Sequence, residues 1–389
     1  MLLHQNSWAL IERTPNSMIV KQPSVNSIVS PWEQGSEFHL MENIRKDEHF
    51  ESPWNRGGLF FGSGRDAFKA ILFLGMASMG WKRLWIPAYF CQKVVDAILE
   101  TGINVQCYQS WYPGERGEND CPCTVIRGDV VLVVNHFGLK SEIKLGFDIS
   151  NAAAIIEDHT HDPWSSWASN SKADYCIASL RKTLPVPDGG VLWSPKLQEL
   201  PTPPPLTDQH RSAAGKKLEA MRMKALFLKG QIVDKSSYRA LSLAGEENLC
   251  GRDISAILEW TEQNLDRFPT GEWREARKRN HETLRQVISS LKWVQVVCPR
   301  VMTSVVPFSC VLLFDSAERR ESVRIKLIQS DIYPAILWSL QNPAIEGIPV
   351  EHTNASTRML SIHCDMRYSE RDMSYVANCI KGFGNEFKG

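Results

Sequence analysis

The sequence lacks an excess of charge of either sign. Lys plus Arg and Asp plus Glu each total 44 among 389 residues, so the formal net charge is zero. Proteins that gather nucleic acid or an anionic membrane usually carry clustered positive charge, which creates a long-range attractive field. The balanced composition therefore argues against both partners and favours a small-molecule substrate.

The sequence also lacks a hydrophobic run long enough to span a membrane, and no cationic stretch leads into an apolar one after Met1. We therefore expect a cytosolic protein. Ten cysteines are present, but a chain of this size needs no disulfides, and only Cys121 and Cys123 lie close together. Since this pair lacks a two-residue spacer and a second ligand pair, we interpret the cysteines as core residues and expect no metal site.

Length and composition predict a folded protein with more than one core. A chain of 389 residues exceeds one ordinary core, and 43% hydrophobic with 23% charged residues is typical of globular proteins. Residues 1–57 are polar and interrupted by prolines, which indicates an N-terminal arm. We expect a large domain over 58–290 and a small C-terminal domain over 291–389.

Short apolar runs recur in the first half of the large domain, and most are continuous rather than alternating. Continuous runs are typical of strands buried on both faces of a sheet. The runs are Leu84 to Ile86, Val130 to Val134, Ala154 to Ile156, Tyr175 to Ala178 and Val191 to Trp193. Helical patterns follow at about 211–230, 251–267 and 272–292. This order predicts an α/β fold in which a large mixed sheet carries helices on both faces.

The pattern changes near residue 293 to strand, strand, helix, strand, helix. The segments are Trp293 to Val297, Cys310 to Phe314, Ala317 to Gln329, Met359 to Cys364 and Ser369 to Ile380. Such an order is typical of a small α+β domain.

Polar groups follow two of the predicted strands directly. Asp158 ends one of them, and Ser179 and Lys182 end the next. Ligands of open α/β sheets lie beyond the carboxyl ends of strands, so these side chains are expected to face one crevice. Catalysis by pyridoxal 5′-phosphate (PLP) needs a lysine amine and a carboxylate that keeps the pyridine nitrogen protonated. Lys182 and Asp158 supply these two groups.

A phosphate group needs hydroxyl and backbone N–H donors, ideally at a helix N-terminus. Ser179 and the 62–65 turn, Gly-Ser-Gly-Arg, which runs into an apolar helical pattern, supply them. Each feature alone has an ordinary structural explanation as a turn, a cap or a solvated lysine. The spacing from Ser179 to Lys182 also matches a serine acyl-transfer motif, but the Ser-Asp-Asn and Lys-Thr-Gly elements of that chemistry are absent. The ordered set therefore favours PLP.

These segments resemble the DegT/DnrJ/EryC1/StrS aminotransferases, and in particular a divergent branch of that family. The resemblance covers residues 58–195 and extends faintly through 360–368. It rests on Ser63-Gly64-Arg65-Asp66-Ala67, Ile86-Pro87-Ala88-Tyr89-Phe90-Cys91, Glu157-Asp158, and Ser179-Leu180-Arg181-Lys182 with Pro185, Pro187 and Gly189-Gly190. It implies an aspartate-aminotransferase-like fold (PLP fold type I) and a homodimer with active sites between subunits. It also implies amino transfer, commonly to keto-sugars or cyclitols.

The resemblance assigns roles to individual residues. Lys182 becomes the lysine that forms a Schiff base with PLP, Asp158 the partner of the pyridine nitrogen, and Ser179 a phosphate ligand. Gly64 and Arg65 would donate backbone N–H groups to the phosphate.

Other assignments concern the surroundings of the cofactor. His161 falls where the family has Gln or His near it, and either Phe90 or Tyr89 would cover the ring. Asn135 would bond the ring hydroxyl or be an ordinary turn residue. Arg367 is a candidate substrate-binding residue, because a guanidinium matches a carboxylate, and its alternative is a structural role.

The chain departs from the family at His159 and Thr160, which replace small residues, and in its long arm. We predict a PLP-dependent transferase in a biosynthetic pathway that moves an amino group from glutamate or glutamine to a keto acceptor, such as a keto-sugar or a natural-product intermediate. The alternative is a non-transaminating PLP enzyme that catalyses decarboxylation, replacement or carbon–carbon bond formation. A non-catalytic PLP-binding protein is a third possibility, but it would not need Lys182. Donor, acceptor and pathway stay open.

Overall fold

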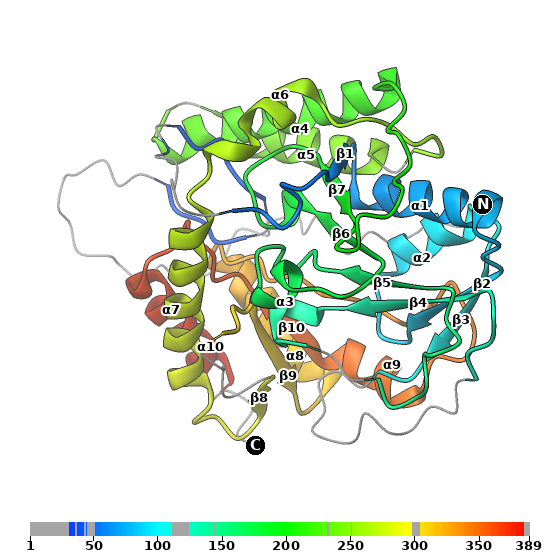
Figure 1. The fold of residues 1–389 in the computed structure, drawn as a ribbon. Helices are drawn as coiled ribbons and strands as arrows, with labels where there is room; N and C mark the ends of the chain where they lie inside the picture. The colour runs from blue at the N-terminus through cyan, green and yellow to red at the C-terminus, as the bar shows by residue number, and fades with distance from the viewer. Residues whose placement is uncertain are drawn as a thin grey trace, which may run out of the picture.

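The chain builds two sheets of unequal size, each covered by helices (Figure 1). This computed structural model describes residues 31–35, 37–42, 44, 51–110, 124–142, 145–231, 233–249, 251–297 and 304–384. Cys121 and Cys123 lie outside the described residues, so their predicted role in the core is not addressed.

The large sheet has seven strands in the order β1-β7-β6-β5-β4-β2-β3. Neighbouring strands from β2 to β6 run parallel, whereas β7 is antiparallel to both β6 and β1. All five predicted strands belong to this sheet, and β1 and β3 were not predicted. The bounds are β1 (Leu59–Phe61), β2 (Arg83–Pro87), β3 (Asn104–Tyr108), β4 (Asp129–Val134), β5 (Ala154–Asp158), β6 (Tyr175–Ser179) and β7 (Gly190–Trp193).

Both faces of the large sheet are buried, which explains the continuous apolar runs. In β4, Val130 and Leu132 join a core with α1 (Gly64–Ser78) and α2 (Gln92–Leu99). Val131 and Val133 point to the opposite face, where they pack near Trp167 of α3 (Ser166–Ser169). The predicted α/β class, a mixed sheet with helices on both faces, is confirmed.

The helices after the sheet differ in part from the prediction. The long α4 (Asp208–Leu228) and α7 (Thr270–Ile288) are confirmed, whereas α5 (Lys235–Asn248) was missed. The predicted helix over 251–267 is wrong in its first half, because the helical part is α6 (Glu259–Asn264) followed by a 3-10 turn, η3 (Leu265–Arg267).

Tertiary hydrogen bonds explain the extended course of residues 251–258. The backbone N–H of Gly62 donates to Ser255 over 2.7 Å, and the N–H of Leu258 donates to the buried carboxylate of Asp188 over 2.8 Å. Thr261 and His210 bond the same carboxylate. These long-range partners override local helix propensity, which is a weak determinant.

The smaller sheet has the order β10-β9-β8 and is antiparallel. Its strands are β8 (Val294–Val296), β9 (Cys310–Phe314) and β10 (Met359–Ile362), and its helices are α8 (Ala317–Gln329), α9 (Val350–Arg358) and α10 (Glu370–Gly384). The predicted α+β order is confirmed, although α9 was missed. Leu284 and Ile288 of α7 also pack in this second core, so α7 connects the two units. The exact domain boundaries stay a prediction.

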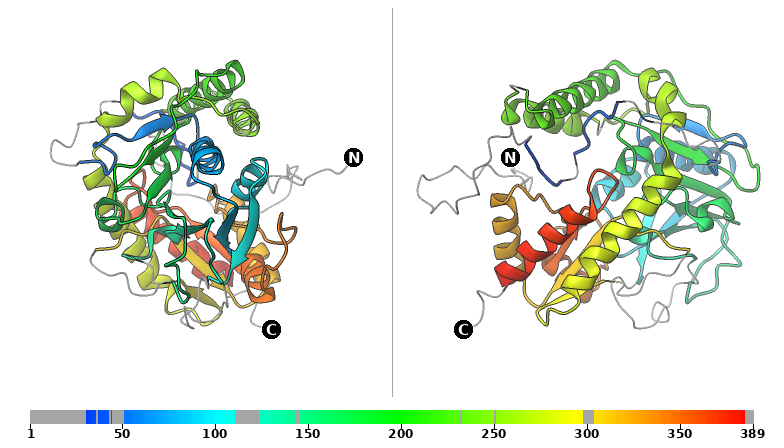
Figure 2. Two further views of the ribbon diagram at one scale, coloured as in Figure 1. Left: turned by 45° about the vertical axis from the view of Figure 1, so that its right-hand side comes forward. Right: turned by 90° about the vertical axis from the view of Figure 1, so that its left-hand side faces the viewer.

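The described part of the N-terminal arm runs between the α4–α5 pair and the smaller unit (Figure 2). The N–H of Leu40 donates to Met221 of α4 over 3.0 Å, and Gln34 forms a parallel bridge with Ile332 beyond α8. The arm therefore contacts both units.

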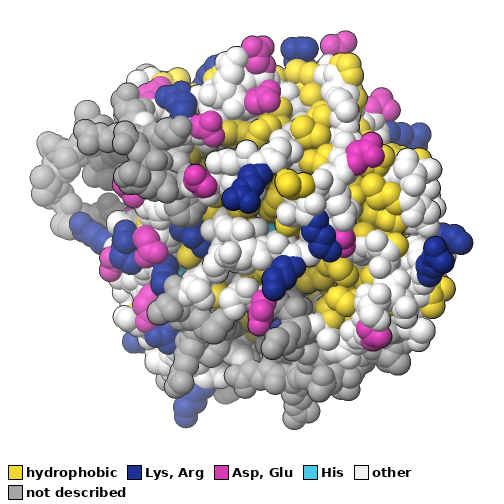
Figure 3. Space-filling model, viewed as in Figure 1, with side chains coloured by type: hydrophobic (Ala, Val, Ile, Leu, Met, Phe, Trp, Pro, Cys, Tyr) yellow, Lys and Arg dark blue, Asp and Glu magenta, His cyan; other side chains and the backbone are white. Residues whose placement is uncertain are grey.

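Charged side chains of both signs are interspersed on the face shown in Figure 3. This distribution agrees with the zero net charge. Among the helices of the described residues, none has the length and apolar content needed to cross a membrane.

The first testable prediction concerns Gly190, where β7 passes the start of α1. A Cβ at this position would lie 2.2 Å from the backbone carbon of Ser63. Gly190→Ala should therefore lower the free energy of unfolding by about 1–3 kcal/mol or more, as overpacking does. Gly215→Ala on α4 is the control, because its Cβ would meet nothing within 4 Å. It should be neutral or stabilise by about 0.5–1 kcal/mol. Equal unfolding midpoints in urea for the two variants would contradict the close approach.

Candidate active site

A cavity of about 1090 Å³ opens at the carboxyl ends of the central strands. Val134, Asp158 and Ile177 occupy neighbouring register positions on β4, β5 and β6, and all three line it. The other walls come from the N-terminus of α1, the α4–α5 pair, the smaller unit and the arm. Three parallel strands thus bring side chains near their carboxyl ends to one place. The sequence had predicted that Asp158 and Lys182, which follow two of these strands, face one crevice, and both line this cavity.

Asp158 is a buried carboxylate at the end of β5. Burial raises its pKa above the ordinary aspartate value, although hydrogen bonds from Thr160 oppose the shift. The backbone N–H of Thr160 donates to Oδ1 over 2.8 Å and fixes the orientation of the carboxylate. A buried carboxylate that accepts neutral donors is suited to bind a cation.

Lys182 ends a single 3-10 turn, η2 (Leu180–Lys182), directly after β6. A hydrogen bond of 3.0 Å from the N–H of Leu180 to Gly189 closes the loop that carries this turn. The side chain lines the cavity and is exposed to it. The positive charge of Arg181, followed by burial, lowers the pKa of Lys182 to about 8, while Glu246 partly opposes this. The neutral, nucleophilic amine is therefore accessible near neutral pH.

The N-terminus of α1 abuts the end of β6. A Cβ on Gly64 would lie 3.0 Å from the Cβ of Ser179, so a larger residue here would require Ser179 to move by a few tenths of an ångström. Ser63 caps the helix by accepting a hydrogen bond from the N–H of Asp66 over 3.2 Å. Gly64, Arg65 and Ser179 all line the cavity. A capped helix N-terminus beside a serine hydroxyl is suited to bind an anion.

Thr160 connects two of these groups, which the sequence did not reveal. Its hydroxyl accepts a hydrogen bond of 3.0 Å from the N–H of Ser179, while its own N–H bonds Asp158. Thr160, which stands where the resembled aminotransferases have a small residue, therefore forms hydrogen bonds within the site.

His159 points to the other face of β5, away from the cavity. Its Nε2 lies 2.9 Å from Oε2 of Glu157, and the thiol of Cys176 lies 3.8 Å from the same oxygen. Burial raises the pKa of Glu157, but the hydrogen bond and charge of His159 together with hydrogen bonds from Ser171 and Trp167 outweigh it, so the pKa is below the ordinary value. This buried polar cluster therefore packs on the face of β5 opposite the cavity.

His161 lines the cavity as a neutral imidazole. Burial, followed by the charges of His136 and Lys182, lowers its pKa to about 3. Its Nδ1 accepts the backbone N–H of Phe137 over 2.9 Å, so Nε2 carries the proton. The ring stacks on Trp338 with 5.6 Å between centroids and an interplanar angle of 20°. Trp338, which also lines the cavity, was not singled out in the sequence.

The structure distinguishes between Phe90 and Tyr89, the two candidates for the aromatic side chain that covers the cofactor ring. Phe90 lines the cavity, whereas Tyr89 is buried in a different apolar cluster and donates its hydroxyl to Leu337 over 3.0 Å. Phe90 is therefore the better placed aromatic. Asn135 directly follows Val134 but does not itself line the cavity, and its side-chain amide is buried without a hydrogen-bond partner among the described residues. Its two alternative roles stay open.

Arg367 lines the cavity, but it is engaged by the protein itself. Its Nε and one Nη bind the carboxylate of Asp365 at 2.7 Å each. The Nη groups also donate to the arm carbonyls of Gly35 and Glu37 over 2.6 Å each. These contacts favour the structural alternative over the substrate-binding role, since little of the guanidinium is left for a ligand.

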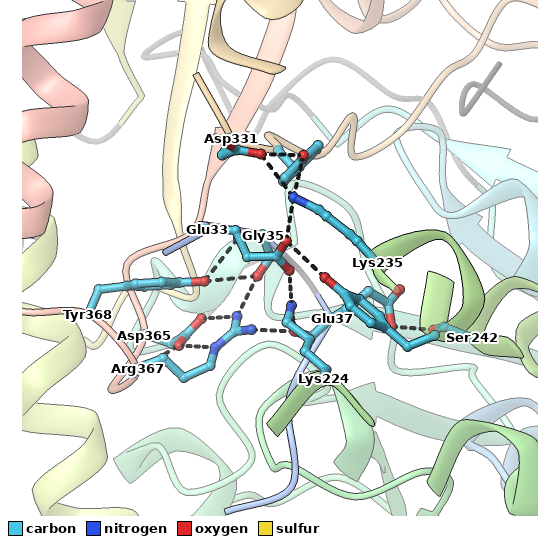
Figure 4. A network of polar contacts seen from close by, with 12 residues as sticks. Glu33, Gly35, Glu37, Lys224, Lys235, Ser242, Asp331, Asp365, Arg367 and Tyr368 are labelled. Atoms are coloured by element: carbon cyan, nitrogen blue, oxygen red, sulfur yellow. Dashed lines mark hydrogen bonds and ion pairs between the residues drawn. The ribbon is translucent and has the colours of Figure 1, made fainter. Parts of the chain in front are cut away.

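A charged network ties the arm to both units (Figure 4). Glu33 lies 2.6 Å from Lys224 of α4 and 2.8 Å from Lys235 of α5, and both Glu33 and Lys224 are buried. Burial raises the pKa of Glu33, but the two lysines outweigh it and lower the pKa to about 2. Because Glu37 and Phe38 line the cavity, this network holds one of its walls.

Arg277 of α7 also lines the cavity, and the sequence did not single it out. Several charged residues surround it in the helix sequence, so no local pattern distinguishes it.

No family model matches the sequence, and no curated protein matches it significantly. Solved structures do share its fold. PseC of Helicobacter pylori, an aminotransferase involved in pseudoaminic acid biosynthesis, has a TM-score of 0.58 at 10% identity, over 92% of this chain and 100% of PseC. The aminotransferase TlmJ of Streptoalloteichus hindustanus has a TM-score of 0.54 at 13% identity, over 85% of this chain and 87% of TlmJ. These matches confirm the predicted aminotransferase fold, PLP fold type I.

The second testable prediction concerns Glu33. Glu33→Gln should leave the buried ammonium of Lys224 without a counter-charge and lower the free energy of unfolding by about 3–5 kcal/mol at pH 7. Because the folded pKa is depressed, the stabilisation is full above about pH 4.5 and is lost as the pH falls toward 2. The difference in unfolding free energy between Glu33→Gln and the unmodified protein, measured by urea unfolding, should therefore become smaller as the pH falls from about 4.5 toward 2.

Glu42→Gln is the matched control for this experiment. Glu42 also joins the arm to α4, through Lys229 at 2.8 Å, but both side chains are exposed. This variant should leave stability nearly unchanged. Equal effects of the two substitutions would contradict a buried anchor at Glu33.

Proposed function

We propose that this chain is a PLP-dependent aminotransferase. The observation that carries the proposal is the convergence of Lys182, Asp158 and the α1 N-terminus on one cavity. The fold supports it, since PseC and TlmJ are both aminotransferases. Like many folds, this one hosts several chemistries, so the argument depends on the site.

The residues around the cavity fit PLP. Backbone N–H groups at Gly64 and Arg65, with the Ser179 hydroxyl, would hold the phosphate at the helix N-terminus. Asp158 would bind the pyridine nitrogen, and Phe90 and His161 would flank the ring. The volume of about 1090 Å³ is sufficient for a cofactor together with a substrate.

When bound, PLP supplies an aldehyde for an incoming amine and a ring that accepts electrons from the substrate Cα. Lys182 contributes the amine that anchors the cofactor. When a substrate amine takes its place on the cofactor, the Nζ of Lys182 would be free in the cavity to take the proton from the substrate Cα. The lowered pKa of about 8 suits this role, because a base is most useful near the working pH.

Asp158 contributes a fixed negative charge. Its raised pKa shows that burial disfavours the carboxylate while it lacks a cationic partner. A protonated ring nitrogen would supply that partner through a charge-assisted hydrogen bond, and the pKa would then fall. The hydrogen bond from Thr160 keeps the carboxylate oriented throughout.

The proposed donor is glutamate or glutamine, and the proposed acceptor is a ketone such as a keto-sugar. Which bond of the substrate breaks depends on the one aligned with the π system of the ring, so decarboxylation or bond formation is the competing outcome. The homodimer implied by the family resemblance stays a prediction, as does a cytosolic location.

The third testable prediction concerns Lys182. Protein incubated with PLP should absorb visible light, and borohydride should fix the cofactor on Lys182, as peptide mapping by mass spectrometry would show. The rate at which the protein binds PLP covalently should rise with pH up to about 8, because only the neutral amine of Lys182 reacts and its pKa is about 8.

Two variants sharpen this experiment. Lys182→Ala should form no covalent link, whereas Lys93→Ala, which removes another lysine of the cavity lining, should keep the adduct on Lys182. An adduct on a different lysine, or failure to bind PLP, would refute the assignment.

The fourth testable prediction concerns the reaction. With PLP bound and no acceptor present, glutamate should yield one equivalent of 2-oxoglutarate per active site, measured by mass spectrometry. Asp158→Asn should slow this step severely, because a neutral amide does not keep the ring nitrogen protonated. Release of carbon dioxide, or a coupled product, would instead favour the non-transaminating alternative.

A further inference from the structure

Arg277 is a buried cation with no direct ion-pair partner among the described residues. Arg277 is 3% exposed and lines the cavity. Its Nε is buried without a hydrogen-bond partner, and within the described part of the chain no hydrogen bond or ion pair joins its guanidinium to another side chain or carbonyl. An uncompensated buried charge is costly, so this arrangement requires an explanation.

Several other cations around the cavity are paired with carboxylates. Arg181 and Lys217 share the carboxylate of Glu246, at 2.7 Å and 2.9 Å, and Arg367 binds Asp365. Arg274, one turn before Arg277 on α7, binds Asp162 at 2.8 Å. The protein therefore supplies carboxylates to the neighbours of Arg277, which indicates that the anion for Arg277 comes from a ligand.

We propose that Arg277 binds the carboxylate of the amino-acid substrate through paired hydrogen bonds. This role deepens the proposed aminotransferase function and rests on it. It also differs from the sequence prediction, which named Arg367 for the same task. A planar guanidinium presents two parallel N–H groups and matches a carboxylate bidentately.

The groups near Arg277 favour a singly charged anion. His161, Cys364 and Asp365 all lie within electrostatic reach of Arg277. Burial lowers the pKa of His161 to about 3, so this ring is neutral at pH 7 and adds no positive charge. Asp365 is a negative neighbour that would repel the second charge of a phosphate. A carboxylate, with one charge, suits the single guanidinium better.

The position of Arg277 also suits the reaction. Arg277, His161 and Lys182 all line the same cavity, and besides burial the positive charges of Lys182 and Arg277 both lower the pKa of His161. A substrate whose carboxylate binds Arg277 would therefore direct its amino end toward the part of the cavity that contains Lys182. Binding by a remote group in this way orients the reacting atoms.

The fifth testable prediction concerns Arg277 and is measured by the melting temperature of the cofactor-free protein. Glutarate, which is glutamate without its amino group, should raise the melting temperature of the unmodified protein but not of Arg277→Met. Without ligand, Arg277→Met should itself raise the melting temperature by about 2–4 °C, because it removes an unpaired buried charge. Inorganic phosphate should protect both proteins equally through the α1 N-terminus.

A second arm measures the half-reaction of the PLP-loaded enzyme. Arg277→Met should raise KM for glutamate by about 10- to 100-fold, the loss expected for a charged hydrogen-bonded pair. Arg277→Lys should recover part of this loss, since a lysine keeps the charge but not the planar geometry. Arg279→Met is the control on the same helix, because Arg279 is exposed, and it should match the unmodified enzyme.

The outcomes separate the two proposals. If Arg277→Met melts lower or fails to fold, the protein itself holds Arg277, and the inference is wrong. The inference is also wrong if glutarate protects the variant as well as the unmodified protein, or if only phosphate protection is lost. If glutarate protection depends on Arg277 but glutamate yields no 2-oxoglutarate, the carboxylate site stands and the aminotransferase proposal fails.

Discussion

The close approach of β7 to the start of α1 is the constraint on which the site depends. Gly190 leaves no room for a Cβ against Ser63, and Gly64 leaves little against Ser179. The two glycines let the N-terminus of a capped helix reach the end of β6, just before the turn that carries Lys182. A bulkier residue at either position would separate the anion-binding helix end from the reactive amine. The chemistry of the site is thus fixed by backbone packing before any ligand binds.

Charge balance distinguishes binding groups from structural ones. Most buried ions of the described residues have partners, such as Glu33 with Lys224 and Arg367 with Asp365. The carboxylate of Asp158 and the guanidinium of Arg277 are both buried, both line the cavity, and neither forms an ion pair with a described residue. Unbalanced buried charge lowers stability, and proteins retain it where function requires it. The pair therefore describes a ligand that presents a cation at one end and an anion at the other.

Much of the fold and part of the site could be predicted from the sequence. Continuous apolar runs identified five strands because both faces of the sheet are buried, and their polar ends identified Asp158, Ser179 and Lys182. The failures have a common physical cause. Residues 251–258 are extended because Asp188 and Gly62 bond them across the fold, and nothing local reveals this. Arg277 was missed for the same reason, since the missing partner of a buried charge is visible only in space.

The two arginines show how a structural residue can still shape a binding site. The sequence offered Arg367 as a candidate because a guanidinium matches a carboxylate, with a structural role as the alternative. In the structure its carboxylate partner is Asp365, two residues before it. Its guanidinium also lies 4.2 Å from the ring centre of Phe38, a residue of the arm that lines the cavity. Arg367 therefore holds the arm, and with it one wall of the cavity, in place. Among the described residues Arg277 has no such partner, which is why the direct contact with a carboxylate is proposed for it.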